Sequence, residues 1–397
     1  MKKYHVGALV AAGCMVVTGL AAATPSSAAS SKSPVVIADV SIQTGPYATP
    51  GRNNDLNLAV SQLNAKGGIA GHPVKVEFFD SSLTPEQAVT ATQQAIGVKP
   101  TLITGYSIDD QVQASASLLK SSGIPVISWA QGPAAASKLV GVPNLYTVVP
   151  NLVSAIQGAA VYAFKTYHPT TVGIFHTEDT ASDADAAVAE SLLKAEGVKN
   201  FVVNSAADAA TDATEQALAM KGASVVFEYG FPLVEAVFNT ALTQNGITAP
   251  IMGDQSGNSL AGDHLNTPAE LTKYTFTPYC FAPVLKTAAA KAYVSAYTAA
   301  YPGQSLQLTT PYGYDDINML AAAVKADGGS LSASKLVKTL GTMTYNGVCG
   351  TYHSDAAHEL IHQVTEVSFA KGINPGTLAA KYTEKPVPAK YMKSSFG

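Results

Sequence analysis

Five consecutive residues near the C-terminal end of the chain have the types and spacing of a zinc-peptidase motif. In His358-Glu359-Leu360-Ile361-His362, two histidines stand four positions apart and a glutamate follows the first. On a helix, this spacing lets both imidazoles bind one Zn²⁺ while the glutamate acts as general base. The motif also needs a third ligand, for which Glu366 is too near and Glu384 stands at a suitable distance. We therefore keep a secreted zinc metallopeptidase as the alternative function.

The residues around this motif favour a strand over a helix. Residues 352–355 are typical of a turn, and residues 363–367 alternate as a strand does. Positions i and i+4 on a strand lie too far apart to share one zinc ion with helix geometry. Other catalytic patterns are incomplete: residues 105–109 and 257–261 lack the closing glycine of G-x-S-x-G, and no G-x-x-x-x-G-K-[ST] occurs. The sequence thus contains no complete catalytic motif apart from residues 358–362, and no cofactor is expected.

Composition indicates a folded chain with more than one domain. The 397 residues are 47% hydrophobic and 13% charged, which argues against extended disorder. The net charge is -4, and no cluster of lysine or arginine occurs, so nucleic acid is a poor candidate for a partner.

Residues 1–29 have the pattern of a signal peptide. Lys2 and Lys3 precede an apolar stretch, and Ser27-Ala28-Ala29 is a small-residue cleavage site. The protein is therefore expected to be exported, to the periplasm or to the cell envelope and extracellular space. Cys14 gives a degenerate match to a lipoprotein signal, so it either carries a lipid anchor or is removed with the signal peptide.

Removal of the signal peptide leaves two cysteines, Cys280 and Cys349. An even number in an oxidising compartment suggests a disulfide. Two buried thiols are the alternative, and spacing alone does not decide between them.

Strand and helix patterns alternate along the chain in two successive runs. An apolar run from Val35 predicts a buried strand, Leu56, Val60 and Leu63 recur at helical spacing, and a second strand ends near Asp80. Further on, Thr84-Pro85-Glu86-Gln87 predicts a capped helix start, and Ser154 is a plausible cap for the helix that begins the second run. Two such runs predict an α/β protein with two lobes.

In open α/β sheets, ligands bind beyond the carboxyl ends of the strands. The residues that follow the predicted strands are therefore candidates for a binding site. They occupy the turns 43–50, 105–110, 129–132, 176–182, 230–231 and 253–258.

Two motifs carry a resemblance to a known family. Gly45-Pro46, and then Asn64-Ala65-Lys66-Gly67-Gly68-Ile69-Ala70-Gly71, resemble the branched-chain amino acid family of type 1 periplasmic binding proteins, and the likeness extends over nearly all of the mature chain. The resemblance implies two Rossmann-like lobes joined by a three-strand hinge, with chain crossings near Val149, Tyr279 and Val348. It places residues 34–149 and 280–347 in lobe 1, and residues 150–279 and 348–397 in lobe 2.

The resemblance also implies a set of ligand-binding residues. Hydroxyl and backbone donors near Ser107, Asp109, Ala130, Gln131 and Gly132 would hold a ligand carboxylate. Phe231 would stack on the ligand, and an acid after Met252-Gly253 would receive its ammonium group. The remaining predicted ligand-binding residues are Tyr47, Ser182, Asp254 and Gln255.

At two of these positions the sequence departs from the family pattern. The acid's position falls on Gln255, with Asp254 one residue earlier, and Ala181-Ser182 replaces the expected tyrosine–glycine pair. A buried ammonium group needs a charged acceptor, so we expect weak or absent binding of leucine, isoleucine and valine. An aromatic-lined site for a less polar solute could instead be formed by Tyr47, Tyr106, Trp129, Tyr229 and Phe231.

Each of these residues also has a structural alternative. An aromatic side chain at a strand end can pack against the adjacent helix. Ser107 could cap the following helix, and Asp109 could be a solvated turn residue.

The resemblance places Cys280 and Cys349 on neighbouring crossing segments, where a disulfide would tie the hinge together without preventing rotation. It further implies that the protein captures a small organic solute, amino-acid-like or aromatic, by lobe closure. ABC transporter permease subunits would be its partners.

Overall fold

The computed structural model describes residues 32–383 except 46–47, 49, 131–140 and 307–310. The predicted signal peptide with Cys14 lies outside the described residues. So do three predicted ligand-binding residues, Tyr47, Gln131 and Gly132, and the third zinc ligand considered above, Glu384.

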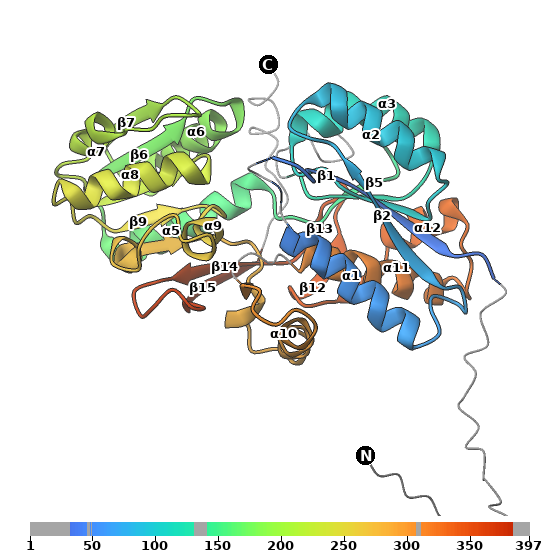
Figure 1. The fold of residues 1–397 in the computed structure, drawn as a ribbon. Coiled ribbons are helices and arrows are strands. Elements are labelled where there is room, and N and C mark those ends of the chain that lie inside the picture. Colours follow the sequence, from blue (N-terminus) through green and yellow to red (C-terminus); the bar gives the residue numbers. More distant parts are fainter. Residues whose placement is uncertain (1–31, 46–47, 49, 131–140, 307–310, 384–397) are drawn as a thin grey trace, which may run out of the picture. The chain divides into compact units, whose positions relative to one another are not determined.

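The first sheet is parallel. From one edge to the other its strands are β2 (Val74–Asp80), β1 (Val35–Ser41), β3 (Leu102–Gly105), β4 (Val126–Ser128) and β5 (Leu145–Thr147). Its helices are α1 (Pro50–Ala65), α2 (Pro85–Gly97), α3 (Asp109–Ser122) and α11 (Tyr312–Ala326). Figure 1 shows α2 and α3 together on one face, and α1 and α11 together on the other. Helices on both faces explain why Val35, Ile37 and Val40 of β1 are fully buried.

The start of α2 confirms the capping prediction. The Thr84 hydroxyl accepts a hydrogen bond from the backbone N–H of Gln87 at 3.3 Å, and Pro85 is the first helical residue. The prediction for Ser154 was wrong. α5 (Leu152–Tyr167) begins earlier, because the side chain of Asn151 caps it by accepting from the Ser154 N–H at 2.9 Å.

The second sheet has seven strands. In order they are β15 (Thr377–Thr383), β14 (Gln363–Ser368), β10 (Tyr274–Phe276), β9 (Ile251–Gly253), β8 (Val225–Tyr229), β6 (Thr171–Thr177) and β7 (Asn200–Ala206). The strands from β10 to β7 are parallel, while β14 and β15 are antiparallel additions. The helices around this sheet are α5, α6 (Thr180–Ala195), α7 (Thr214–Ala219), α8 (Pro232–Gln244) and α9 (Gly257–Gly262).

Alternate side chains of β8 enter two hydrophobic clusters on opposite faces of the second sheet. Val225 and Phe227 pack with side chains of α5 and α6, whereas Val226 packs with side chains of α7, α8 and α9. This period of two is the normal geometry of a strand covered on both sides. The carboxyl ends of β8 and β9 are therefore held in a rigid layer.

A small third sheet contains β11 (Thr344–Asn346), β12 (Thr351–Ser354) and β13 (Leu360–Ile361). Val348, Tyr352 and Leu360 share a hydrophobic cluster with residues of the first sheet's helices. The third sheet therefore packs with the helices of the first sheet. The described residues also form η2 (Glu270–Lys273), η3 (Ala282–Val284), α10 (Ala288–Ala300) and α12 (Ala333–Leu340).

The two cysteines form the predicted disulfide. The Cα atoms of Cys280 and Cys349 are 5.4 Å apart, within the usual range for a disulfide, and both residues are buried. The bond joins the segment after β10 to the segment before β12.

Candidate ligand-binding site

The zinc-peptidase motif does not form a metal site. His358 lies in a turn with φ 64°, and Leu360–Ile361 is a strand rather than part of a helix. The ring of His358 stacks on Tyr146. The ring nitrogens of His362 lie 3.0 Å from the carbonyl oxygen of Leu360 and 3.1 Å from the hydroxyl of Tyr312.

The two glutamates considered for the zinc site, Glu359 and Glu366, also contact other residues. The Glu359 carboxylate accepts a hydrogen bond from the side chain of Asn151 at 3.1 Å, and Glu366 contacts Thr277. In the described part of the chain, no three histidine, cysteine, aspartate or glutamate residues are grouped to hold a metal ion. The alternative function was therefore wrong, because the motif lacks the helix that it requires.

The turns that follow β3 and β4 contain three of the predicted ligand-binding residues. Ser107 is exposed, Asp109 is half-buried as the first residue of α3, and Ala130 is buried. Ser107 does not cap α3, since Ile108 occupies the cap position and makes no side-chain cap bond. Instead, the Ser107 hydroxyl accepts a hydrogen bond from Nη1 of Arg52 at 2.7 Å.

Arg52 is the residue of this region that sequence reasoning missed. It is the only arginine in the sequence, it lies on α1, and it is 3% exposed. Its guanidinium lies 3.5 Å from the centre of the Trp129 ring and forms an ion pair with Asp39 at 3.3 Å. Its contact with Ser107 joins it to the predicted site.

Burial shifts the pKa values of Arg52 and of the acids beside it. Burial lowers the pKa of the Arg52 guanidinium and raises the pKa of the Asp39 carboxyl, although each group stabilises the charged form of the other. Asp316 accepts hydrogen bonds from Trp129 Nε1 and from the Thr104 hydroxyl, both at 2.7 Å. Burial nevertheless raises the pKa of Asp316 to about 8.

Of the four predicted ligand-binding residues around the second sheet, Asp254 lines a pocket, and Gln255, Ser182 and Phe231 are not among the lining residues of that pocket. Asp254 follows β9 and lines a pocket, whereas the next side chain, Gln255, is exposed. Ser182 is buried on α6, where its hydroxyl accepts from the Thr177 hydroxyl at 3.0 Å. Phe231 is half-buried at the N-cap of α8 and is not among the lining residues of the pocket.

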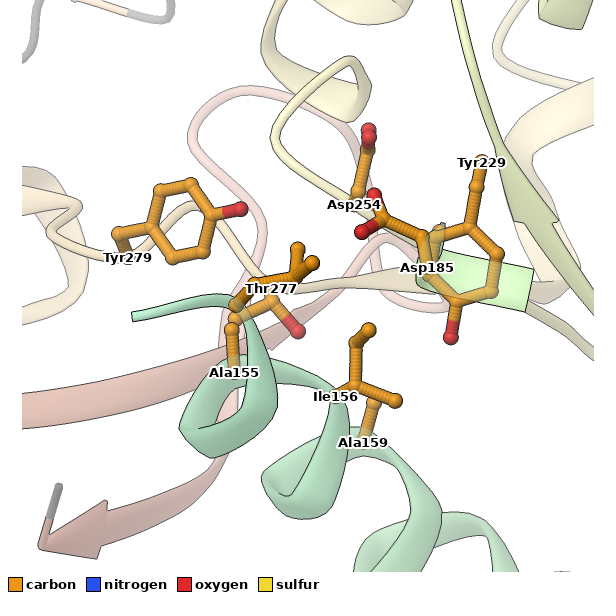
Figure 2. A pocket seen from close by; sticks show the side chains of 10 residues that line it. Ala155, Ile156, Ala159, Asp185, Tyr229, Asp254, Thr277 and Tyr279 are labelled. Carbon is orange, nitrogen blue, oxygen red and sulfur yellow. The ribbon is translucent and has the colours of Figure 1, made fainter. Parts of the chain in front are cut away.

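The pocket around Asp254 is small. Its volume is about 10 Å³, which is room for roughly one water-sized group. Figure 2 shows α5 below the pocket, with the Tyr279 ring on one side and the carboxyl of Asp185 on the other. The lining residues are Leu152, Ala155, Ile156, Ala159, Asp185, Tyr229, Gly253, Asp254, Thr277 and Tyr279.

Two acids of the pocket have raised pKa values. Burial raises the pKa of Asp254 to about 6. The pKa of Asp185 lies well above its usual range, because of burial first and then the negative charges of Asp254, Asp179 and Asp109. Neither Asp185 nor Asp254 forms an ion pair within the described residues.

The aromatic residues considered for the site differ in their surroundings. Tyr106 is fully buried and its hydroxyl lies 2.7 Å from that of Thr92, so it packs against α2 rather than lining a pocket. Tyr229 does line the pocket, as does Tyr279.

Tyr106 and Tyr279 share an unusual backbone conformation. Their φ angles are 59° and 57°, in the left-handed region that bulky residues rarely adopt. Such strain concentrates at functional sites. Here it marks the residue before Ser107 and a residue that lines the Asp254 pocket.

Glu366 contacts Thr277, which lines the pocket, and the burial of its carboxyl leads to a prediction. Its two carboxyl oxygens lie 3.1 and 3.0 Å from the hydroxyl of Thr277. Burial raises its pKa from 4.5 to about 8, so the folded protein holds a proton that the unfolded chain releases near pH 4.5. The contribution of Glu366 to the free energy of unfolding is therefore fully present below pH 4.5. It decreases by about 1.4 kcal/mol per pH unit as the pH rises towards 8.

Glu366→Gln, which resembles the protonated side chain, is expected to remove this part of the pH dependence. Urea unfolding at pH 5 and pH 8 measures it, with Glu190→Gln, a partly exposed acid paired with Lys194 on α6, as control. An unchanged pH slope in Glu366→Gln would contradict the prediction.

Comparisons with known proteins agree on one kind of protein. A model of the family described as periplasmic binding protein matches residues 34–372. Leu/Ile/Val-binding protein homolog 3 of Brucella melitensis biotype 1 is 22% identical over 345 residues, covering 82% of this chain and 90% of that protein. A leucine-, isoleucine-, valine-, threonine- and alanine-binding protein of Pseudomonas aeruginosa is 21% identical, covering 80% of this chain and 84% of that protein.

Solved structures show the same fold. LivJ of Streptococcus pneumoniae, a branched-chain amino acid substrate-binding protein in complex with isoleucine, has a TM-score of 0.76 and 21% identity, covering 89% of this chain and 100% of that chain. A solute-binding protein of an ABC transporter from R. palustris, in complex with 4-hydroxybenzoate, has a TM-score of 0.75 and 18% identity, covering 89% of this chain and 98% of that chain.

Proposed function

Because this chain belongs to the periplasmic binding protein family, whose members bind solutes and are not enzymes, we propose that it captures a small organic solute for an ABC importer. The observation that carries the proposal is the family match over residues 34–372, which spans the first sheet, the second sheet except β15, and the disulfide. Permease subunits of the importer are the expected partners, and the protein acts after export. Cys14 is the proposed position of a lipid anchor if the signal is of the lipoprotein type.

We further propose that the solute is bound by closure of two lobes, each built on one of the large sheets. Binding then favours the closed form through contacts that only this form makes. Support comes from the placement of the predicted residues: Ser107 and Asp109 follow β3, and Asp254 follows β9. In open α/β sheets, ligands bind at these carboxyl ends.

A ligand screen by thermal shift, followed by small-angle scattering, tests this function. A solute present at 100 times its Kd stabilises the protein by about 2.7 kcal/mol. We expect at least one amino acid, amide, amine or aromatic acid to raise the Tm and to make the particle more compact. A ligand that raises the Tm and leaves the scattering unchanged would count against closure, and a screen without any shift would count against solute capture.

The altered positions predict that branched-chain amino acids bind weakly. Gln255 is exposed and neutral, and Ala181 offers no aromatic ring, so a buried ammonium group loses the charged acceptor that the family pattern supplies. Leucine, isoleucine and valine are expected to bind at least about tenfold more weakly than the best solute of the screen, as the loss of one charge-assisted hydrogen bond implies. Calorimetric titration measures this, and submicromolar binding of leucine would show the prediction to be wrong.

A further inference from the structure

The strand β7 forms one edge of the second sheet, and no strand in the described part of the chain pairs with its outer side (Figure 1). Its seven residues, from Asn200 to Ala206, include neither a charged residue nor a proline. The other edge strands of that length carry charges: Lys75 and Glu77 lie on β2, and Lys381 lies on β15. Charged side chains on an edge strand oppose pairing with another chain, so β7 lacks a protection that the other long edges have.

The pairing of β7 with β6 shows which of its backbone groups point outward. The Ala206 carbonyl accepts a hydrogen bond from the Glu178 N–H at 3.0 Å, so the backbone groups of Ala206 face β6. In a parallel ladder every second residue of an edge strand points its N–H and C=O away from the sheet. These residues are Phe201, Val203 and Ser205. The Ser205 carbonyl confirms the direction, because it accepts from the side chain of Gln216 on α7 at 3.0 Å.

The middle of this edge is apolar and exposed. Val203 is the central residue of β7, and it is 46% exposed. Its neighbours Phe201 and Val202 are instead partly buried against the hydrophobic clusters on the two faces of the sheet. An exposed apolar side chain on an unpaired, uncharged edge strand is a signal for association with another strand.

The charges that flank β7 indicate the direction of such a strand. Lys199 directly precedes β7, and Asp208 follows it by two residues. Glu178 lies at the same end as Asp208, since its carboxylate accepts from the Ser205 hydroxyl at 3.0 Å. A parallel copy of β7 would bring these acids beside their own copies. An antiparallel copy would instead bring the lysine of each strand beside the acids of the other, and opposite charges stabilise a cross-strand pair.

We propose that β7 is a self-association edge, at which two copies of this chain pair antiparallel about a twofold axis through Val203. Val203 then lies opposite its own copy, and Phe201 lies opposite Ser205 of the partner subunit. Residue 199 of each copy comes opposite residue 207 of the other, next to the acid at position 208. The two second sheets thereby join into one continuous sheet. This inference goes beyond solute capture and does not depend on which solute is bound.

Sedimentation equilibrium of the purified exported protein, at low salt and over a range of protein concentrations, tests the inference. An interface built on one seven-residue edge is small, so we expect a dimer whose population rises with concentration. Val203→Lys places two ammonium groups opposite each other at the axis. Leu83→Lys is the matched control, because Leu83 is 43% exposed and lies between β2 and α2, far from β7 in the sequence.

We expect the dissociation constant of the dimer to rise at least about tenfold in Val203→Lys and to stay unchanged in Leu83→Lys. Because both side chains are exposed, both variants should fold. Their unfolding midpoints, measured at a concentration where the wild type is monomeric, check this.

A charge exchange tests the antiparallel direction. Lys199→Glu and Asp208→Lys each bring like charges together in the proposed pairing, so each alone should weaken the dimer. The double variant restores opposite charges and should recover the wild-type dissociation constant. In a parallel pairing the two positions do not meet, and the double variant would not recover.

Four outcomes would overturn the inference. A wild type that is monomeric at every concentration would show that the edge does not associate. A dimer that Val203→Lys leaves intact would place the interface on another surface. A double charge variant that associates no better than the single variants would exclude the antiparallel register. Assemblies that grow beyond two copies would show open association instead of a closed twofold pair. None of these outcomes bears on the proposed function.

Discussion

Arg52→Ala is expected to lower the free energy of unfolding by about 3 to 5 kcal/mol. The substitution leaves the carboxyl of Asp39 buried without its cationic partner, and removing one member of a buried ion pair costs this much. The side chains of Arg52 and Asp39 are 4% and 0% exposed, so solvent screens the pair little. The variant also loses the stacking contact with Trp129 and the hydrogen bond to Ser107. Urea unfolding at neutral pH measures the loss.

A double-mutant cycle separates the ion pair from the packing. Asp39→Asn removes the buried charge, so Arg52→Ala should cost less in that background than in the wild type. Arg52→Lys is expected to lie between the wild type and Arg52→Ala, because an ammonium group cannot reach Asp39 and Ser107 as a fork. Equal losses in both backgrounds would show that the ion pair is not the cause.

Replacement of both cysteines by alanine is expected to lower the free energy of unfolding by about 4 kcal/mol. Cys280 and Cys349 are 69 residues apart, and a disulfide closing a loop of that length restricts the unfolded chain strongly. The loss is measured by urea unfolding of the double variant and of the wild type with and without dithiothreitol.

Reduced wild type and the double variant should behave alike, which is the internal control. Reduction should leave the double variant unchanged. A double variant as stable as the oxidised wild type would contradict the prediction, and would mean that packing in the hydrophobic cluster around both residues dominates.

Periodicity alone predicted most of the fold. The β-α-β unit over residues 35–80 is confirmed, because its first strand begins with four apolar residues and its helix repeats Leu56, Val60 and Leu63. The start of α2 was predicted correctly from adjacent residues, because Thr84 is a good N-cap and Pro85 is favoured at the first helical position. The start of α5 was missed because two polar residues, Asn151 and Ser154, compete for the same role and asparagine is the earlier of them.

The chemistry of the site was harder to predict than the fold. Arg52 stands among Gly51, Asn53 and Asn54, which is typical of an exposed turn, and its burial follows from tertiary packing against Trp129. That it is the only arginine among 24 lysine and arginine residues is the signal that could have identified it. Asp185 lies in an Asp- and Ala-rich helix that resembles a surface helix, and only the approach of β9 brings Asp254 to it. Such pairs depend on contacts between segments far apart in the chain.

The antiparallel pairing of β10 with β14 has a consequence for how the protein reaches its native state. Thr275 pairs with Ser368, 93 positions later, and β15 then adds outside β14. The second sheet therefore stays incomplete until almost the whole polypeptide has been synthesised and moved across the membrane. Closing such distant pairings is slow, and partly assembled sheets aggregate. Until β14 pairs with it, the edge of β10 that β14 covers stays unpaired in the growing chain.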